Sequence, residues 1–252
     1  MKQQIFNYLA IEVYENRELM GAKAALAVSE KINSLLQQQD HVNIIFASAP
    51  SQNEFLDALS LDKTVDWTRV NAFHMDEYIE LPENDPRTFA SFLQKKIFGR
   101  VPLNSINYIN GNAPNIGAEC RRYAKLITQY PPDIICMGIG ENGHLAFNDP
   151  HVADFNDPYL VKMVKLDAAC RQQQINDACF NALADVPAYA ITLTLPALMK
   201  GKFIYGVIPT EKKAEAVYNT LYGEIEEKHP SSILRKHVNA TLFLDKKSSS
   251  LL

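Results

Sequence analysis

The feature that most constrains the fold of this chain is a regular alternation of short, mainly apolar runs with segments of helical periodicity. The clearest apolar runs lie at residues 42–46, 70–75, 134–137 and 203–208, and an amphipathic segment at 16–37 precedes the first of them. Runs of this length without strict alternation are typical of strands that are buried on both faces. The pattern predicts an α/β fold with a doubly wound, mainly parallel sheet of the Rossmann-like type.

The composition gives no reason to divide the chain. It has 252 residues, of which 47% are hydrophobic and 21% are charged, and it contains no repeat, low-complexity tract or Gly/Ser linker. This is an ordinary globular composition at a length that buries a substantial core. We therefore expect residues 1–252 to form a single domain, with only the tail at 246–252 loose. The remaining helices are expected at 53–59, 87–97, 116–129, 167–174, 196–199 and 209–222, and the remaining strands at 106–109, 160–166, 189–195 and 240–244.

Charge and cysteine content exclude several classes of partner. The formal net charge is −4 and no basic run is present, which argues against binding to nucleic acid. No apolar stretch approaches the ~18 residues of a membrane span, and the first ten residues lack the apolar core of a signal peptide. The four cysteines form no C-x-x-C pair, so we expect reduced thiols and a cytoplasmic location.

A glycine-rich segment, Gly-Ile-Gly-Glu-Asn-Gly-His-Leu-Ala-Phe-Asn-Asp-Pro at 138–150, follows the apolar run at 134–137. It carries Gly140, Asn142, His144 and Asp149. Glycines allow sharp turns and a close approach of the backbone to a ligand, and titratable groups at the carboxyl end of a strand are where open α/β sheets place their active sites. The alternative is a structural turn in which the histidine is merely hydrogen-bonded.

The three glycines also fit the spacing G-x-G-x-x-G of dinucleotide-binding proteins, but their context does not. Pro150 comes seven residues after the last glycine and prevents a long helix there. About 20 residues beyond that glycine, where the fingerprint requires an acidic residue, the chain has Met163 between Lys162 and Lys165. We therefore expect neither NAD nor FAD.

A second candidate site is the loop of small residues that follows the strand at 42–46. Ser48, Ala49, Ser51 and Gln52 lie in this loop and lead into a helix. The free N–H groups at the start of a helix make such a loop a potential anion site. The alternative is an ordinary helix start that is capped by Ser51.

Charged residues follow two other predicted strands. Asp76 and Glu77 come at the end of the strand at 70–75, and Lys212 and Lys213 follow the strand at 203–208. Because parallel strands point the same way, all of these loops should meet at one edge of the sheet. Taken alone, two carboxylates at a strand end often belong only to a solvated turn, and most lysines at such places are solvated.

Four blocks of sequence, taken together, have a recognisable order. They are Phe-His-Met-Asp-Glu-Tyr at 73–78, Ile-Asn-Gly-Asn-Ala-Pro at 109–114 followed by Glu-Cys-Arg at 119–121, the glycine-rich segment at 138–150, and Val-Pro-Ala-Tyr-Ala-Ile-Thr at 186–192. From about residue 42 to 245 the chain resembles the glucosamine-6-phosphate deaminase family, whose members are also called isomerases. The related 6-phosphogluconolactonases share a Gly-His loop, but Ala-Phe-Asn-Asp-Pro at 146–150 favours the deaminases.

The resemblance implies a Rossmann-like enzyme that turns a hexosamine 6-phosphate and water into a ketose 6-phosphate and ammonia. Its partner is a small-molecule sugar phosphate, it needs no cofactor and no metal, and it is compatible with a homo-oligomer. The leading reaction is glucosamine 6-phosphate to fructose 6-phosphate. Three alternatives stay open: a galactosamine-6-phosphate enzyme that gives tagatose 6-phosphate, a 6-phosphogluconolactonase, and a sugar-phosphate sensor without catalytic activity.

The resemblance also implies roles for individual residues. Asp76 matches the base that carries a proton between C2 and C1, and Glu77 beside it is a structural neighbour. His144 matches the histidine that opens the sugar ring. The phosphate is assigned to the loop of Ser48 and Ser51, together with Lys213. Ala49, Gln52 and Gly140 belong to the same substrate-binding loops.

The chain departs from the family pattern at several positions. Asn142 stands where the family usually has Asp, and Asp149 stands where it usually has Glu. An Asp would stabilise a protonated His144, whereas an Asn can hydrogen-bond but adds no charge. Asn at this position also occurs in the galactosamine branch of the family, so it bears on the C4 epimer of the substrate.

The phosphate loop departs too, because Ala49-Pro50 replaces a Gly-Gly pair. A phosphate-binding arginine of the family has no clean match in this chain. Gln174 falls near its position, and Arg171 is the nearest candidate.

Overall fold

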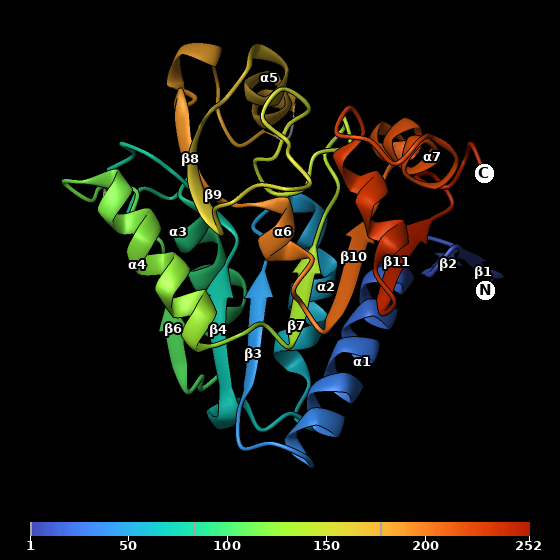
Figure 1. Cartoon of the computed structure of the whole chain (residues 1–252). Helices are drawn as coiled ribbons and strands as arrows, with labels where there is room; N and C mark the ends of the chain where they lie inside the picture. The colour runs from blue at the N-terminus through green and yellow to red at the C-terminus, as the bar shows by residue number, and fades with distance from the viewer. Residues whose placement is uncertain (1, 83, 177) are drawn as a thin grey trace.

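The computed structural model describes residues 2–82, 84–176 and 178–252 and contains two sheets. The main sheet has eight strands in the order β1-β2-β11-β10-β7-β3-β4-β6, and every neighbouring pair is parallel except β1 with β2 (Figure 1). The strands are β1 Lys2–Phe6, β2 Leu9–Tyr14, β3 Val42–Phe46, β4 Val70–His74, β6 Ser105–Asn107, β7 Ile134–Met137, β10 Phe203–Ile208 and β11 Ala240–Asp245.

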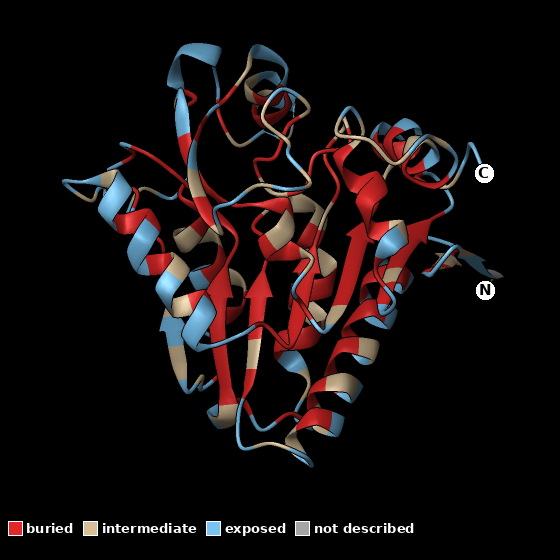
Figure 2. Ribbon diagram, viewed as in Figure 1, coloured by how far each residue is buried: buried red, intermediate tan, exposed pale blue. Residues whose placement is uncertain are grey.

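Helices cover both faces of this sheet, as the predicted doubly wound fold requires. The helices are α1 Arg17–Leu36, α2 Asn53–Leu61, α3 Phe89–Leu93, α4 Ile116–Gln129, α5 Ala168–Asn176, α6 Leu195–Leu198 and α7 Ala214–Tyr222. Side chains of α1 and α2 pack with Ile44 and Phe46 in one core cluster, whereas α4, α6 and α7 pack with Ile45 in another. Neighbouring residues of a strand point to opposite faces, so the buried strands of Figure 2 separate two cores.

A second sheet lies beyond the carboxyl edge of the main one and was not predicted. Its three strands are antiparallel in the order β5 Asp76–Tyr78, β9 Tyr189–Leu193 and β8 Val161–Lys165. Together with α5 it forms the upper part of the molecule in Figure 1. The chain passes from β4 to β5 with only Met75 between them, so the two sheets meet at this point.

The ends of the chain differ from expectation. The hairpin of β1 and β2 at the N-terminus was not predicted, and it adds two strands to the main sheet. The expectation of a loose tail was wrong, because the segment after β11 folds back on the strand. The buried Ser248 donates its backbone N–H to the carboxylate of Asp245 at 2.7 Å.

Two helices begin with a 3₁₀ turn, and the cap that Ser51 could have formed is absent at the first of them. A 3₁₀ turn, Pro50–Gln52, precedes α2, and the Ser51 side chain makes no capping hydrogen bond. A 3₁₀ turn, Glu211–Lys213, likewise precedes α7 without a cap from a side chain. None of the described helices is both long and apolar enough to cross a membrane.

Candidate active site

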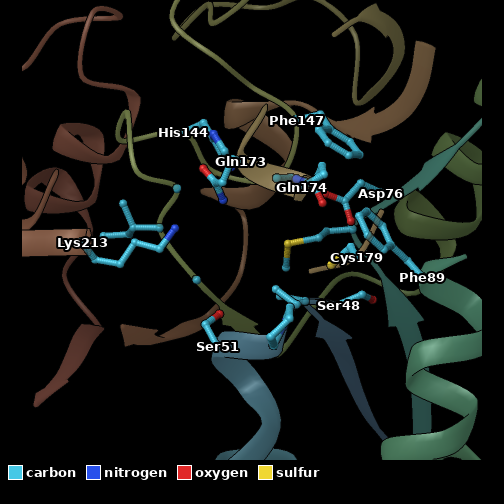
Figure 3. Close-up of a pocket in the computed structure, with 18 of the residues that line it drawn as sticks. Ser48, Ser51, Asp76, Phe89, His144, Phe147, Gln173, Gln174, Cys179 and Lys213 are labelled. Atoms are coloured by element: carbon cyan, nitrogen blue, oxygen red, sulfur yellow. The ribbon is translucent and has the colours of Figure 1, made fainter. Parts of the chain in front are cut away.

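The loops at the carboxyl edge of the main sheet enclose one cavity beneath the second sheet. It is lined by seven of the residues predicted from the sequence: Ser48, Ala49, Ser51, Asp76, Gly140, His144 and Lys213. In Figure 3, Lys213 and Ser51 lie on one side of this cavity and Asp76 lies on the other, with His144 above. The arrangement follows from the parallel sheet, since each loop continues a strand that points to this edge.

Asp76 is the first residue of β5, directly where the chain leaves the main sheet. Its backbone pairs with Thr192 of β9, and its side chain is only 6% exposed although it lines the cavity. Burial first, and then the neighbouring charge of Glu77, raise the pKa of Asp76 well above its usual range. A carboxylate in this environment is a stronger base than one in water, which suits proton transfer near neutral pH.

Glu77 has the structural role that was expected for it. Its carboxylate accepts hydrogen bonds from the backbone N–H groups of Tyr78, Phe89 and Ala90 at 2.9, 3.1 and 2.9 Å. Burial raises the pKa of Glu77 to about 7, and these three hydrogen bonds limit the rise. Glu77 thus ties β5 to the start of α3 and faces away from the cavity.

Glycine is required at position 140 because the ring of His144 lies against it. A Cβ at this position would come within 2.2 Å of the ring carbon Cε1. The backbone N–H of Gly140 donates to the carbonyl of His144 at 2.9 Å, and Gly143 turns the loop with a φ of +85° that favours glycine. The glycines of the segment therefore fold the loop around the histidine.

A half-buried side chain, Asn142, and a buried one, Asp149, hold His144 from behind. Its Nδ1 lies 2.8 Å from Oδ1 of Asn142 and 3.0 Å from Oδ1 of Asp149. Asn142 donates its own Nδ2–H to Asp149 at 2.8 Å, so its oxygen faces the imidazole. Because Nδ1 faces two acceptors it carries the proton, and Nε2 is left for exchange on the other side of the ring.

Asp149 is fully buried and supplies the charge behind the histidine. Burial raises the pKa of Asp149, but the positive charge of His144 and hydrogen bonds from His144, Asn142 and Cys170 outweigh it and lower the pKa to about 2. Neither Asn142 nor Asp149 lines the cavity. Both therefore act on His144 rather than on a bound ligand, and Asn142 is not placed to read a sugar hydroxyl.

The small-residue loop lines the cavity from below, and in Figure 3 Ser51 lies toward Lys213 whereas Ser48 lies below Asp76. Ser48 is 8% exposed, and its Oγ has no hydrogen-bond partner among the described residues. Gln52, which was also predicted to bind substrate, is buried and is not among the residues that line the cavity. Its Nε2 donates to Oγ of Ser51 at 3.0 Å and to the carbonyl of Val207 at 3.1 Å, so it positions Ser51.

A strained backbone brings Lys213 to the side of the cavity where Ser51 lies. Thr210 lines the cavity and has a φ of +77°, which costs a β-branched residue of order 1–3 kcal/mol. Its backbone N–H donates to both carboxylate oxygens of Asp245 at 3.2 Å, which holds this conformation. The turn that follows ends at Lys213, whose side chain is 6% exposed and points toward the cavity in Figure 3.

Arg171, which was predicted to bind substrate, is not among the residues that line the cavity. The guanidinium of Arg171 donates to the carbonyls of Leu183 and Val186 at 2.6 and 2.8 Å, because the turn there leaves both oxygens available. Gln173 and Gln174, from the same helix α5, line the cavity instead.

Several lining residues were missed by the sequence analysis. Phe89, Phe147 and Cys179 lie around Asp76 in Figure 3, and Met75 also lines the cavity. Arg17, from the start of α1, lines the cavity as well and donates to the carbonyl of Pro50. The strand–helix succession of β2 and α1 places Arg17 at the same edge as the other loops. The mainly apolar run Leu-Ala-Ile-Glu-Val-Tyr at residues 9–14 was the signal that could have located it.

Comparison with known proteins agrees with this geometry. The family model described as "Glucosamine-6-phosphate isomerases/6-phosphogluconolactonase" matches residues 15–243. Glucosamine-6-phosphate deaminases of Bacillus cereus (strain B4264) and Bacillus anthracis (strain CDC 684 / NRRL 3495) are each 36% identical over 187 residues, which cover 74% of this chain and 70% of the relative.

Solved structures of the same kind share the fold. A structure described as a monomeric glucosamine-6-phosphate deaminase is 27% identical with a TM-score of 0.88, and the match covers 96% of this chain and 99% of that one. A 6-phosphogluconolactonase from Thermotoga maritima is 19% identical with a TM-score of 0.78, covering 94% of this chain and all of the other. At that identity the second match supports the fold alone.

Proposed function

Because the chain belongs to the family of glucosamine-6-phosphate isomerases and 6-phosphogluconolactonases, we propose that it is a hexosamine-6-phosphate deaminase. It converts glucosamine 6-phosphate and water into fructose 6-phosphate and ammonia. The observation that carries the proposal is the buried carboxylate of Asp76 at one end of a cavity whose other end holds Lys213. A base and an anion site at opposite ends fit a phosphorylated sugar.

In the proposed reaction His144 first exchanges a proton with the ring oxygen, so that the pyranose opens to an aldehyde. The hydrogen bonds of Asn142 and Asp149 fix the ring orientation and leave Nε2 for this transfer. Histidine suits the step because it both accepts and donates a proton near neutral pH.

Asp76 then removes the proton from C2 and returns it to C1, which moves the double bond and gives an imine at C2. Water adds to this imine, and the C–N bond breaks to release ammonia and leave the ketone. The apolar wall of Phe89, Phe147 and Met75 keeps Asp76 poorly solvated and therefore basic.

The phosphate is assigned to the opposite end of the cavity. Lys213 supplies a charge there, and the buried Oγ of Ser48 and the side chain of Ser51 supply hydrogen-bond donors. Remote binding energy of this kind positions the reacting carbons, so free glucosamine should be a very poor substrate.

The deciding experiment is an ammonia assay across glucosamine 6-phosphate, galactosamine 6-phosphate and unphosphorylated glucosamine, with 6-phosphogluconolactone hydrolysis measured in parallel. Release of ammonia from an amino-sugar phosphate supports the proposal, and the ratio of the two epimers assigns the substrate. Lactone hydrolysis without ammonia release would reassign the chain to the lactonases. Thermal stabilisation by sugar phosphates without any turnover would indicate a sensor.

The same assay tests the base directly through Asp76→Asn, which keeps the shape and removes the charge. Turnover should fall by at least ~10²-fold, the usual scale for a lost general base, while substrate affinity changes far less. The matched control is Asp40→Asn, because Asp40 is exposed and precedes β3 at the opposite edge of the sheet. Near-normal turnover by Asp76→Asn would remove Asp76 from the mechanism.

A sugar-phosphate substrate also bears on the setting in which the protein works. We propose a cytoplasmic location, without a nucleic-acid partner. A homo-oligomer stays a prediction, to be tested by measuring the molar mass in solution.

A further inference from the structure

The phosphate end of the cavity carries a second cation that the sequence analysis did not assign. Among the described residues that line the cavity, Arg17 and Lys213 are the two with a permanent positive charge. The arginine expected there from α5 is absent, since Arg171 donates to backbone carbonyls elsewhere and Gln174 faces the cavity instead.

Contacts within the neighbouring loop hold Arg17 in place. Its Nε donates to Oε2 of Glu54 at 2.6 Å, and its Nη2 donates to the carbonyl of Pro50. Guanidinium has five N–H donors, and no described residue accepts a hydrogen bond from Nη1. The side chain is 26% exposed, so it is fixed at one edge and accessible at another.

The position of Arg17 is set by the fold rather than by a flexible loop. It is the first residue of α1, and this helix begins at the carboxyl edge of the sheet, where β2 ends (Figure 1). The contact with Pro50 brings it to the loop that contains Ser48, whose buried Oγ has no partner among the described residues. Arg17 therefore presents an unused donor beside this loop.

We propose that Arg17 is a substrate-binding residue that contacts the phosphate of the sugar and replaces the arginine missing from α5. The inference rests on the proposed function for the identity of the substrate. A planar guanidinium binds two phosphate oxygens at once, whereas the ammonium of Lys213 acts as a point charge. Arg17 thus confers selectivity for a phosphorylated ligand over a neutral sugar.

The test measures binding without turnover. Glucitol 6-phosphate has no ring and no amino group, so it cannot react, and inorganic phosphate serves as the second probe. Dissociation constants are measured by calorimetry for the wild-type chain, Arg17→Met, Arg17→Lys and Arg100→Met. Arg100 is the matched control, because it also bonds a carboxylate of α2 and a backbone carbonyl but does not line the cavity.

Arg17→Met should raise the dissociation constants of both probes by ~10- to 100-fold, the range expected for a lost charge-assisted hydrogen bond. Arg17→Lys keeps the charge and should raise both dissociation constants by a smaller factor. If the Met variant fails to fold, the Lys variant alone decides the test. Arg100→Met should leave both dissociation constants within about twofold of the wild-type values. Unchanged binding in both Arg17 variants would overturn the inference, as would a loss confined to the sugar phosphate.

Activity separates this inference from the proposed function. If the wild-type chain releases no ammonia while phosphate binding still depends on Arg17, the proposed reaction fails and the anion site stands. If ammonia is released and KM is unchanged in Arg17→Met, the reaction stands and the role of Arg17 fails.

Discussion

Replacement of Asp149 by Asn tests the electrostatic support behind His144. The substitution keeps the size of the side chain and removes a negative charge that lies 3.0 Å from Nδ1 of His144. Because Asp149 is fully buried, solvent screens this interaction little. We expect the variant to be less stable and slower, since the imidazole loses both its counter-charge and one acceptor.

The size of the effect follows from the pKa of Asp149. A fall from 3.8 to about 2 on folding corresponds to about 2 kcal/mol of stability in favour of the ionised, folded form. The stability that a depressed pKa provides is complete above the pKa of the unfolded state, and it is lost as the pH falls through the pKa of the folded state. The contribution is therefore complete at pH 6, falls to about half by pH 3 and disappears below pH 2.

The assay is urea unfolding of the wild-type chain, Asp149→Asn and the control Asp40→Asn at pH 6, 4 and 3. The free energy of unfolding of the wild-type chain should exceed that of Asp149→Asn by about 2 kcal/mol at pH 6, and this difference should fall to about half at pH 3. Asp40→Asn should match the wild-type chain within ~0.5 kcal/mol at every pH. A difference that is absent at pH 6, or constant down to pH 3, would refute the reasoning.

Two further predictions concern the other supports of the site. Glu77→Gln removes a negative charge that raises the pKa of Asp76. The acidic limb of the pH profile of kcat/KM should therefore move to lower pH. If the limb stays in place, it does not report the titration of Asp76. Gly140→Ala places a Cβ within 2.2 Å of the His144 ring, which should lower kcat more than ~10-fold and cost ~1–3 kcal/mol in urea unfolding. Gly117→Ala in α4 is its control, because a Cβ there meets nothing closer than 3.4 Å, and equal effects of the two substitutions would contradict the clash.

The elements that the sequence predicted best are those whose pattern is local. The helix at 116–129 and the strand at 134–137 were predicted with the observed bounds, because a continuous amphipathic stripe and a continuous apolar run are complete signals. The hairpin of β1 and β2 was missed, since three of the five residues of β1 are the polar Lys2, Gln3 and Gln4 and the turn depends on Asn7 with a φ of +58°. Its stability comes from pairing with β11, which local pattern does not reveal.

The site was predicted to the extent that the fold alone determines it. A parallel sheet requires the loops after β3, β7 and β10 to meet at one edge, whichever residues they carry. Which side chains then face the cavity depends on contacts within each loop. Gln52 and Arg171 do not line the cavity, and both side chains donate hydrogen bonds to backbone carbonyls, which the sequence pattern does not reveal.

The relative position of the base and the histidine is set by one strand, β9. Thr192 pairs its backbone with Asp76 and accepts a hydrogen bond at its Oγ1 from the backbone N–H of Phe147 at 3.1 Å. Asn148 donates to the carbonyl of Leu193 at 2.8 Å, so the loop that carries His144 is fixed to the same strand. The second sheet therefore does more than cover the cavity. Because both loops are anchored to adjacent residues of β9, the relative position of Asp76 and His144 is defined by a hydrogen-bonded ladder, which is more rigid than either loop alone.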